Sequence, residues 1–307
     1  RHAATLGGRD LIGDRVPIDI VALARFAGTR HSIELPSYDA LYEFSVARGG
    51  EFWSCLWDYL QIVGTKGTEA LSGDTSSVQH ARWFPKAELN FAENLLRRPG
   101  DDEAVVCLTE IGTRRTLSWS ELNTLVRQCM RSLRSMGVRP GDRVAGYLPN
   151  GPDALIAMLA TTGLGAIWCA CAPDYGVQAC LDRLQQIQPS VLFSADGYSH
   201  RGRWHDLTEK TQALVNGLPG LRHTVQGPSE PNAGFRGRRI GVDVADLCRG
   251  DAGEVEFERF PFAHPAFILF SSGTTGKPKC IVHGAGGTLL QTAKELALQC
   301  DVKAGDK

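Results

Sequence analysis

The residues best suited to chemistry lie in one short run near the end of the chain, Ser271-Ser272-Gly273-Thr274-Thr275-Gly276-Lys277-Pro278-Lys279. The run combines two glycines, four hydroxyl side chains and two lysines. Glycine lets successive backbone N–H groups turn toward one anion, hydroxyls add further donors, and lysine supplies a compact positive charge. This composition predicts a loop that binds the phosphates of a nucleoside triphosphate.

Other phosphate-binding and catalytic loops do not fit the run. A Walker loop needs four residues between its glycines and a Ser or Thr after its lysine, whereas here two residues separate the glycines and a proline follows Lys277. The dinucleotide fingerprint fails because Leu289 stands where the third glycine after Gly284 and Gly286 is required. An esterase has no anchor either, because the sequence contains no Gly-x-Ser-x-Gly motif.

The run meets every fixed position of a known family pattern, Ser/Thr-Ser-Gly-Ser/Thr-Thr-Gly-x-Pro-Lys. It therefore resembles the phosphate-binding loop of the adenylate-forming superfamily, which includes the acyl-CoA synthetases. Residues 82–96 resemble the leader of short-chain acyl-CoA synthetases, and their ending, Ala-Glu-Asn-Leu-Leu, is similar to the acetoacetyl-CoA synthetase branch. Further stretches similar to that branch are residues 165–168, 173–177, 181–183, 279–283 and 285–289. The departures are small: Cys169 and Cys171 stand where serines are common, and Phe91 where a tyrosine is common.

The resemblance implies a reaction in two steps. The carboxylate of acetoacetate attacks the α-phosphate of ATP, which gives acetoacetyl-AMP and pyrophosphate, and the thiol of coenzyme A then displaces AMP. Mg²⁺ is expected with ATP, although the sequence does not identify its ligands. The loop would hold the β- and γ-phosphates while charge accumulates on the leaving pyrophosphate. The hydroxyl donors would be Ser271, Ser272, Thr274 and Thr275; Gly273 and Gly276 would allow close approach; Lys279 matches the fixed lysine and Lys277 the variable position.

A second candidate site is the run Arg201-Gly202-Arg203. In the related acetyl-CoA synthetases, arginines after a corresponding strand bind the 3′-phosphate of coenzyme A. A guanidinium group suits a phosphate dianion, so Arg201 and Arg203 are candidates for that contact. The alternative, two solvated loop arginines, remains open at this point.

Composition sets limits on the other function classes. The 307 residues include 33 basic and 34 acidic side chains, a net charge of −1, which argues against a nucleic-acid partner. No uninterrupted apolar run approaches the roughly 20 residues needed to span a bilayer. None of the nine cysteines forms a Cys-x-x-Cys pair, so reduced thiols in a cytoplasmic protein are expected. The oligomeric state is not predicted.

The elements that would position these residues alternate between strand and helix from residue 102 onward. Short apolar runs predict strands at 104–108 (buried), 143–148, 166–170, 191–194 and 266–270. Helices are predicted at 119–136, where Ser118 and Glu121 form a capping box, and at 153–164, 177–187 and 207–216. Residues 226–239 read as a surface loop. Such alternation predicts a doubly wound α/β fold, a mostly parallel sheet with helices on both faces.

The chain divides into two regions by pattern. Residues 1–98 form a leader with an aromatic-rich stretch at 37–60, expected as one or two short helices whose aromatic residues belong to a core. Residues 99–307 would be the first part of an AMP-forming adenylation domain. Family members continue for several hundred residues beyond this point, so the chain is expected to be an N-terminal fragment, inactive alone. Two alternatives remain: a synthetase for another short-chain acid such as acetate, propionate or butyrate, and a truncated, non-catalytic nucleotide-binding paralogue.

Overall fold

The structure is a computed structural model that describes residues 18–74, 77, 79–112, 114–230, 234–251, 253, 255–271, 276, 278–303 and 305–306. The chain forms two compact units. Unit 1 comprises Arg1–Leu89, Pro261–Ala263 and Ala285–Lys307, and unit 2 comprises Asn90–Phe260 and His264–Gly284. No helix of the described residues is long and apolar enough to cross a membrane.

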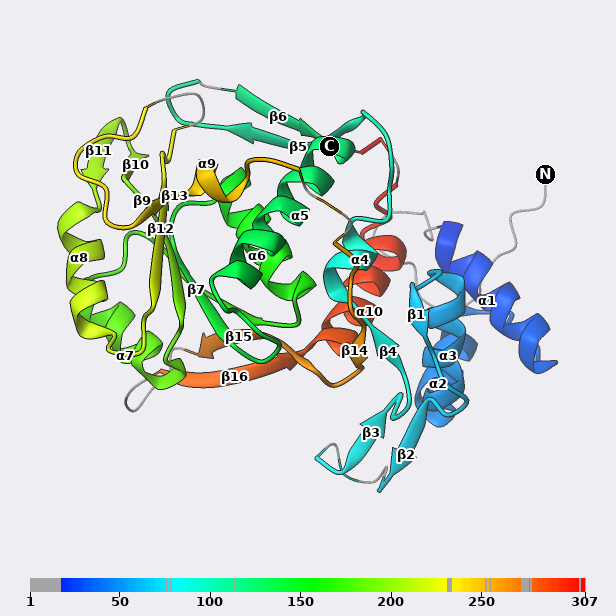
Figure 1. Cartoon of the computed structure of the whole chain (residues 1–307). Coiled ribbons are helices and arrows are strands. Elements are labelled where there is room, and N and C mark those ends of the chain that lie inside the picture. The colour runs from blue at the N-terminus through cyan, green and yellow to red at the C-terminus, as the bar shows by residue number, and fades with distance from the viewer. Residues whose placement is uncertain are drawn as a thin grey trace. The chain divides into compact units, whose positions relative to one another are not determined.

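Unit 2 is built on a seven-stranded sheet in the order β13-β12-β9-β7-β8-β15-β16 (Figure 1). All neighbouring strands are parallel except β15 and β16, which are antiparallel. Helices α5, α6 and α9 cover one face, and α7 and α8 cover the other (Figure 1). The sheet strands are β7 (Arg143–Tyr147), β8 (Ile167–Cys171), β9 (Val191–Ala195), β12 (His223–Gly227), β13 (Val242–Asp243), β15 (Pro265–Ser271) and β16 (Lys279–Gly284). This arrangement confirms the predicted doubly wound α/β fold.

The helices of unit 2 begin and end where local signals predict. The Ser118 hydroxyl accepts from the Glu121 N–H at 3.1 Å, and the Glu121 carboxylate accepts from the Ser118 N–H at 2.7 Å, which completes the capping box of α5. Gly137, at φ +80°, follows that helix in the left-handed region that glycine favours. The helices are α4 (Phe91–Leu95), α5 (Trp119–Ser135), α6 (Pro152–Gly163), α7 (Val177–Ile187), α8 (Thr208–Gly217) and α9 (Val244–Leu247).

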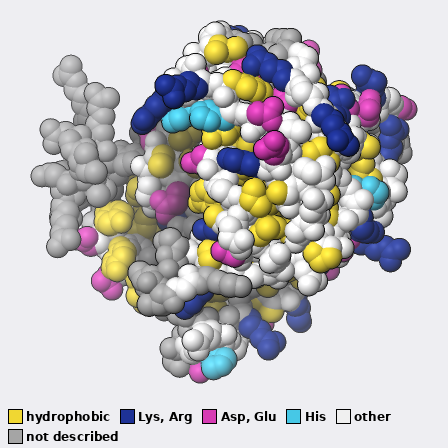
Figure 2. All heavy atoms as spheres, turned by 90° about the vertical axis from the view of Figure 1, so that its left-hand side faces the viewer, with side chains coloured by type: hydrophobic (Ala, Val, Ile, Leu, Met, Phe, Trp, Pro, Cys, Tyr) yellow, Lys and Arg dark blue, Asp and Glu magenta, His cyan; other side chains and the backbone are white. Residues whose placement is uncertain are grey.

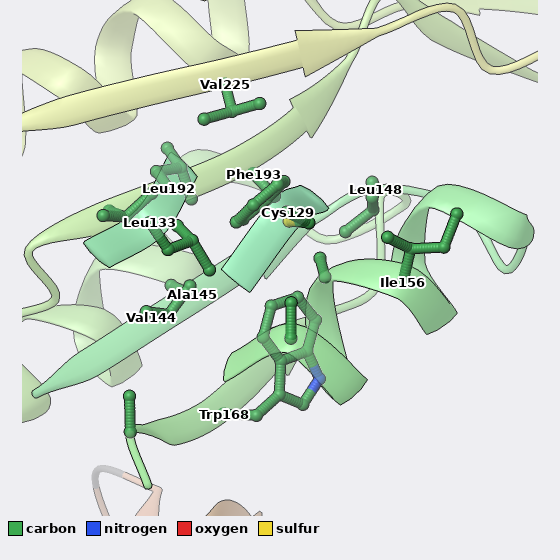
Figure 3. Packing of buried hydrophobic residues seen from close by; sticks show 14 of the residues in the cluster. Cys129, Leu133, Val144, Ala145, Leu148, Ile156, Trp168, Leu192, Phe193 and Val225 are labelled. Atoms are coloured by element: carbon green, nitrogen blue, oxygen red, sulfur yellow. The ribbon is translucent and has the colours of Figure 1, made fainter. Parts of the chain in front are cut away.

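The core of unit 2 lies between the sheet and the helices (Figure 3). Cys129 and Leu133 of α5 belong to this core together with Val144 and Ala145 of β7, and all four are buried (Figure 3). Close packing leaves little room at the centre, since a Cβ on Gly146 would lie 2.8 Å from the Trp168 ring. The central strands are thereby fixed side by side, and the loops that follow them share one edge of the sheet.

One strand prediction and one loop prediction need correction, and one strand was not predicted. Residues 104–108 form a strand, β5 (Glu103–Leu108), but it pairs with β6 (Arg114–Ser118) in a separate two-stranded antiparallel sheet, and Leu108 is 71% exposed. An apolar run does not show by itself whether both faces of a strand are covered, so the expected burial was wrong. The predicted surface loop at 226–239 begins too early, because Gln226 and Gly227 are the buried end of β12. The strand at 266–270 is followed by one more strand, β16, which pairs with it.

Unit 1 contains the predicted helical stretch and several short strands. The stretch at 37–60 forms two helices, α2 (Tyr38–Ala47), which Ser37 caps, and α3 (Gly49–Tyr59). Buried Phe44, Phe52 and Leu56 belong to its core, as expected, whereas Tyr42 of the same stretch is 54% exposed, so the expectation that it belongs to a core was wrong. The other elements are α1 (Ile18–His31), β1 (Gly64–Thr65), β2 (Leu71–Gly73), β3 (Ala81–Trp83), β4 (Glu88–Leu89), α10 (Ala285–Lys294) and a π-helical turn at Glu295–Gln299; β14 (Phe260–Pro261) lies where the chain passes from unit 2 to unit 1.

Candidate functional site

The predicted phosphate loop joins β15 to β16 at the carboxyl end of β15. Ser271 is the last residue of β15, Lys279 is the first of β16, and the two are paired across the antiparallel ladder. Of the residues between them, Gly276 and Pro278 are described, whereas Ser272, Gly273, Thr274, Thr275 and Lys277 lie outside the described residues. Ligands of open α/β sheets bind beyond the carboxyl ends of parallel strands, and the Ser271–Lys279 pair stands at such an end.

Lys279 is exposed, and no carboxylate in the described part of the chain forms an ion pair with it. Its register partner Ser271 is half-buried. An exposed lysine without a carboxylate partner can contact an anion that arrives from solvent, and Ser271 can add a hydroxyl donor beside it.

Helix α7 contacts the strands on both sides of the loop. The Arg183 guanidinium lies 4.9 Å from the Tyr175 ring centre and 5.8 Å from that of Phe270, the residue before Ser271. The Gln186 side-chain amide donates to the Pro278 carbonyl at 3.0 Å, and its oxygen lies 3.5 Å from the Cys280 sulfur, which donates to it. The sequence analysis missed these contacts; the spacing of Arg183 and Gln186 on one helical face was the available signal.

Arg201 and Arg203 lie on a tight hairpin formed by β10 (Gly197–His200) and β11 (Arg203–Asp206). Arg201 and Gly202 have φ of +52° and +71°, as a two-residue type I′ turn requires. The Glu110 carboxylate accepts from the Gly202 N–H at 3.2 Å, and hydrogen bonds from the backbone of Gly202 and Arg201 lower the pKa of Glu110. Both arginines are exposed, so the hairpin brings them together at the surface. The sequence analysis missed the hairpin because its strands are short and polar.

A crevice at the carboxyl ends of β7, β9 and β12 was not predicted from the sequence. It is lined by Arg115, Asp153, Ser194 and Ser229 among others. The Arg115 guanidinium lies 3.8 Å from the Asp153 carboxylate. Burial raises the pKa of Asp153 although the charge of Arg115 acts in the opposite direction. Because the one arginine of this crevice faces a carboxylate, its charge is less available to a phosphate than that of Lys279.

Charges elsewhere on this unit are mixed. On the side that carries α7 and α8, Lys and Arg side chains are scattered among acidic and apolar ones (Figure 2). Among the described residues, no group of three or more His, Cys, Asp or Glu side chains is placed to hold a metal ion. All nine cysteines are free. At the described ends of the loop, the Ser271 hydroxyl and the Lys279 ammonium group are donors that suit phosphate oxygens.

Two family descriptions match the chain. "AMP-binding enzyme" matches residues 91–306, and "Acetyl-coenzyme A synthetase N-terminus" matches residues 38–95. The chain therefore belongs to the AMP-binding enzyme family, which confirms the resemblance to adenylate-forming enzymes.

Particular relatives are similar over nearly the whole chain. The acetoacetyl-coenzyme A synthetase of Rhizobium meliloti (strain 1021) is 41% identical over 96% of this chain and 46% of its own length. A malonamoyl-CoA synthetase of Penicillium aethiopicum is 40% identical over 91% of this chain and 40% of its own length. The solved acetoacetyl-CoA synthetase of Streptomyces lividans superimposes with a TM-score of 0.85 at 38% identity, over 94% of this chain and 44% of its own. The chain thus spans less than half the length of the relatives it matches.

Proposed function

We propose that this chain contributes the phosphate-binding part of an AMP-forming acid–thiol ligase that converts acetoacetate to acetoacetyl-CoA. The observation that carries the proposal is the Ser271–Lys279 pair, which closes a loop of adenylate-forming sequence at the end of a parallel strand. The similarity to acetoacetyl-CoA synthetases over more than nine-tenths of the chain supports acetoacetate as the acid. The similarity to a malonamoyl-CoA synthetase supports another short-chain acid as the alternative.

The roles proposed for the loop residues follow from the place at which negative charge develops during attack on the α-phosphate. As the α-phosphate is attacked, negative charge accumulates on the departing pyrophosphate, and an exposed ammonium group with no carboxylate partner stabilises that charge. Lys279 would supply it, Ser271 would donate a hydroxyl hydrogen bond, and Ser272, Thr274 and Thr275 would add three further donors. Gly273 and Gly276 would allow close approach, and Lys277 is a further candidate contact. Mg²⁺ bound to ATP would neutralise phosphate charge, and its protein ligands are not assigned.

Coenzyme A would be held by Arg201 and Arg203. The hairpin presents both guanidinium groups at the surface, and such groups suit the 3′-phosphate of the cofactor. The alternative of two solvated arginines predicts an unchanged apparent affinity for coenzyme A in Arg203→Ala.

We further propose that residues 1–98 act as a leader region and residues 99–307 as the first part of the adenylation domain. A cytoplasmic location and small-molecule substrates, without a nucleic-acid partner, belong to the same proposal.

The test is ATP–pyrophosphate exchange, measured on this chain and on the longest product of its gene with acetoacetate, acetate, propionate and butyrate. We expect the fastest exchange with acetoacetate. Lys279→Ala should reduce exchange at least about a hundredfold, the scale on which loss of one charge-stabilising donor acts. Lys86→Ala, which removes an exposed lysine of unit 1, is the matched control and should leave the rate unchanged. Nucleotide binding without exchange for any acid would favour the non-catalytic paralogue, and normal exchange in Lys279→Ala would refute the assignment of Lys279.

A further inference from the structure

Two side chains of α7, one helical turn apart, contact the two segments that join the phosphate loop to the sheet. These two arms are the end of β15, which leads into the loop, and residues 278–280, which lead from the loop into β16. Arg183 lies against Phe270, which ends one arm next to Ser271. Gln186 bonds to Pro278 and Cys280, which flank Lys279 in the other arm. Residues three apart on a helix lie on the same face, so a single face of α7 reaches both arms.

The two arms differ in how the sheet supports them. β15 lies between β8 and β16, with Phe267 in register with Trp168 of β8. β16 is the outermost strand in the sheet order, and its residues Lys279, Ile281 and Val282 are exposed. The arm that begins with Lys279 therefore has a strand partner on one side, and Gln186 supplies additional contacts near its start.

Gln186 contacts the chain on both sides of Lys279, through the backbone carbonyl of Pro278 and the side-chain thiol of Cys280. The Pro278 carbonyl belongs to the same rigid peptide plane as the Lys279 N–H, so a hydrogen bond to that oxygen orients the plane that enters Lys279. Proline already fixes its own φ, which leaves this plane with little other freedom. The Cys280 thiol, bound to the oxygen of the same amide, ties the chain immediately after the lysine.

We propose that Gln186, assisted by Arg183, is a positioning residue that aligns Lys279 and its two neighbours in the chain with the triphosphate of ATP. It does not touch the nucleotide; it acts through the backbone of residues 278–280. This proposal rests on the proposed function, because alignment matters only if Lys279 binds phosphate.

The neighbouring residue provides a matched control. Gln185 is also exposed, lies on the same helix, and donates its side-chain amide to the Gly217 carbonyl at 3.0 Å, away from the loop. Gln185→Ala and Gln186→Ala therefore remove the same chemical group and, in each case, one 3.0 Å amide-to-carbonyl hydrogen bond to a residue outside α7. Gln186→Ala also removes the bond from its amide to the Asp182 carbonyl, at 2.6 Å within α7, and the bond from the Cys280 thiol. Gln186→Met keeps the length of the side chain but none of its three hydrogen bonds, so it separates the effect of bonding from that of side-chain volume.

The first readout is amide hydrogen exchange of peptides that cover residues 265–284. We expect amides near the start of β16 to exchange about fivefold faster in Gln186→Ala and Gln186→Met than in the wild type or Gln185→Ala. The second readout is kcat/KM for ATP in the pyrophosphate-exchange assay, on the longest gene product. It should fall about fivefold, which is about 1 kcal/mol at 1.4 kcal/mol per tenfold, while KM for acetoacetate stays unchanged.

The outcomes separate the two proposals. If the wild type catalyses exchange and the Gln186 and Gln185 variants behave alike in either readout, the positioning role is overturned and the proposed function stands. If Gln186→Met behaves as the wild type, the hydrogen bonds are not responsible and the positioning role is overturned. If the wild type shows no exchange with any acid, the proposed function fails, and the role of Gln186 toward ATP fails with it.

Discussion

Asn90 offers a direct test of how buried polar contacts hold unit 2 together. Its side chain is 1% exposed and satisfies three backbone groups at once. The side-chain oxygen accepts from the Glu93 N–H at 3.2 Å and caps α4, while the amide nitrogen donates to the carbonyls of Gly163, at 2.9 Å, and Glu258, at 2.8 Å. Loss of a cap costs about 1 kcal/mol and loss of each buried bond about 1 kcal/mol, so Asn90→Ala should lower the free energy of unfolding by about 3 kcal/mol.

Asn90→Asp separates the cap from the other two bonds. Aspartate caps a helix as well as asparagine does, so the bond from Glu93 survives. The carboxylate, however, would face the oxygens of Gly163 and Glu258, to which it cannot donate. We therefore expect Asn90→Asp to be at least as destabilising as Asn90→Ala at pH 7.

The stability of Asn90→Asp should depend on pH, and the direction of that dependence follows from the pKa of the new carboxyl group. Burial and the facing carbonyls should raise the pKa of the new carboxyl above its unfolded value of about 3.9. A raised folded pKa means that stability is lost as pH rises, so the variant should regain stability as pH falls from 7 toward 4. The assay is urea unfolding at both pH values. Ser118→Asp, at the exposed cap of α5, is the control and should change stability by less than about 0.5 kcal/mol. An Asn90→Asp variant clearly more stable than Asn90→Ala at pH 7 would refute the reasoning, because the cap would then outweigh both donor bonds.

Three further variants test separate features by urea unfolding. Tyr147→Phe removes a buried hydroxyl that lies 3.0 Å from the Pro173 carbonyl and 2.9 Å from that of Tyr175, and should cost about 1–2 kcal/mol. Asp153→Asn should flatten the decline in stability as pH rises from about 4 toward 7, because burial raises the folded pKa of Asp153 and its ionisation therefore opposes folding. Gly165→Ala should lower the free energy of unfolding by at least about 2 kcal/mol, because the φ of Gly165 is +69° and the new Cβ would lie 2.4 Å from a ring carbon of Phe260.

Helices were predictable where their ends are encoded locally. The predicted bounds of α7 match the structure, because Gly176 precedes the helix and Pro189 prevents its continuation. The capping box at Ser118 and the glycine at 137 fixed α5 in the same way. Strands β10 and β11 were missed because they are short and polar, although they pair with each other across a tight turn. Strand β12 was missed because its place depends on a partner distant in sequence. The polar segment His223–Gly227 becomes a strand through its pairing with β9.

The candidate site shows the same contrast between features encoded locally in the sequence and features that depend on distant residues. The loop was predictable because its chemistry is contiguous in sequence. The contacts of α7 with the residues that flank Lys279 were not predictable, because Gln186 and Pro278 are 92 residues apart and only the fold brings them together. Five of the predicted loop residues lie outside the described residues, so their contacts remain predictions.

The hairpin at Arg201 illustrates how a carboxylate can organise a cationic surface without neutralising it. Glu110 accepts hydrogen bonds from the backbone N–H groups of the turn, and this lowers its pKa. The Glu110 carboxylate, which accepts from backbone donors, stabilises a turn that requires positive φ at the non-glycine residue Arg201. The guanidinium groups of Arg201 and Arg203 form no ion pair among the described residues. If Glu110 instead paired with either guanidinium, the turn would gain the same anchor but the surface would lose a free cation. The two exposed arginines are compatible both with binding of a phosphate and with the alternative of two solvated side chains, and the apparent affinity for coenzyme A in Arg203→Ala would decide between the two.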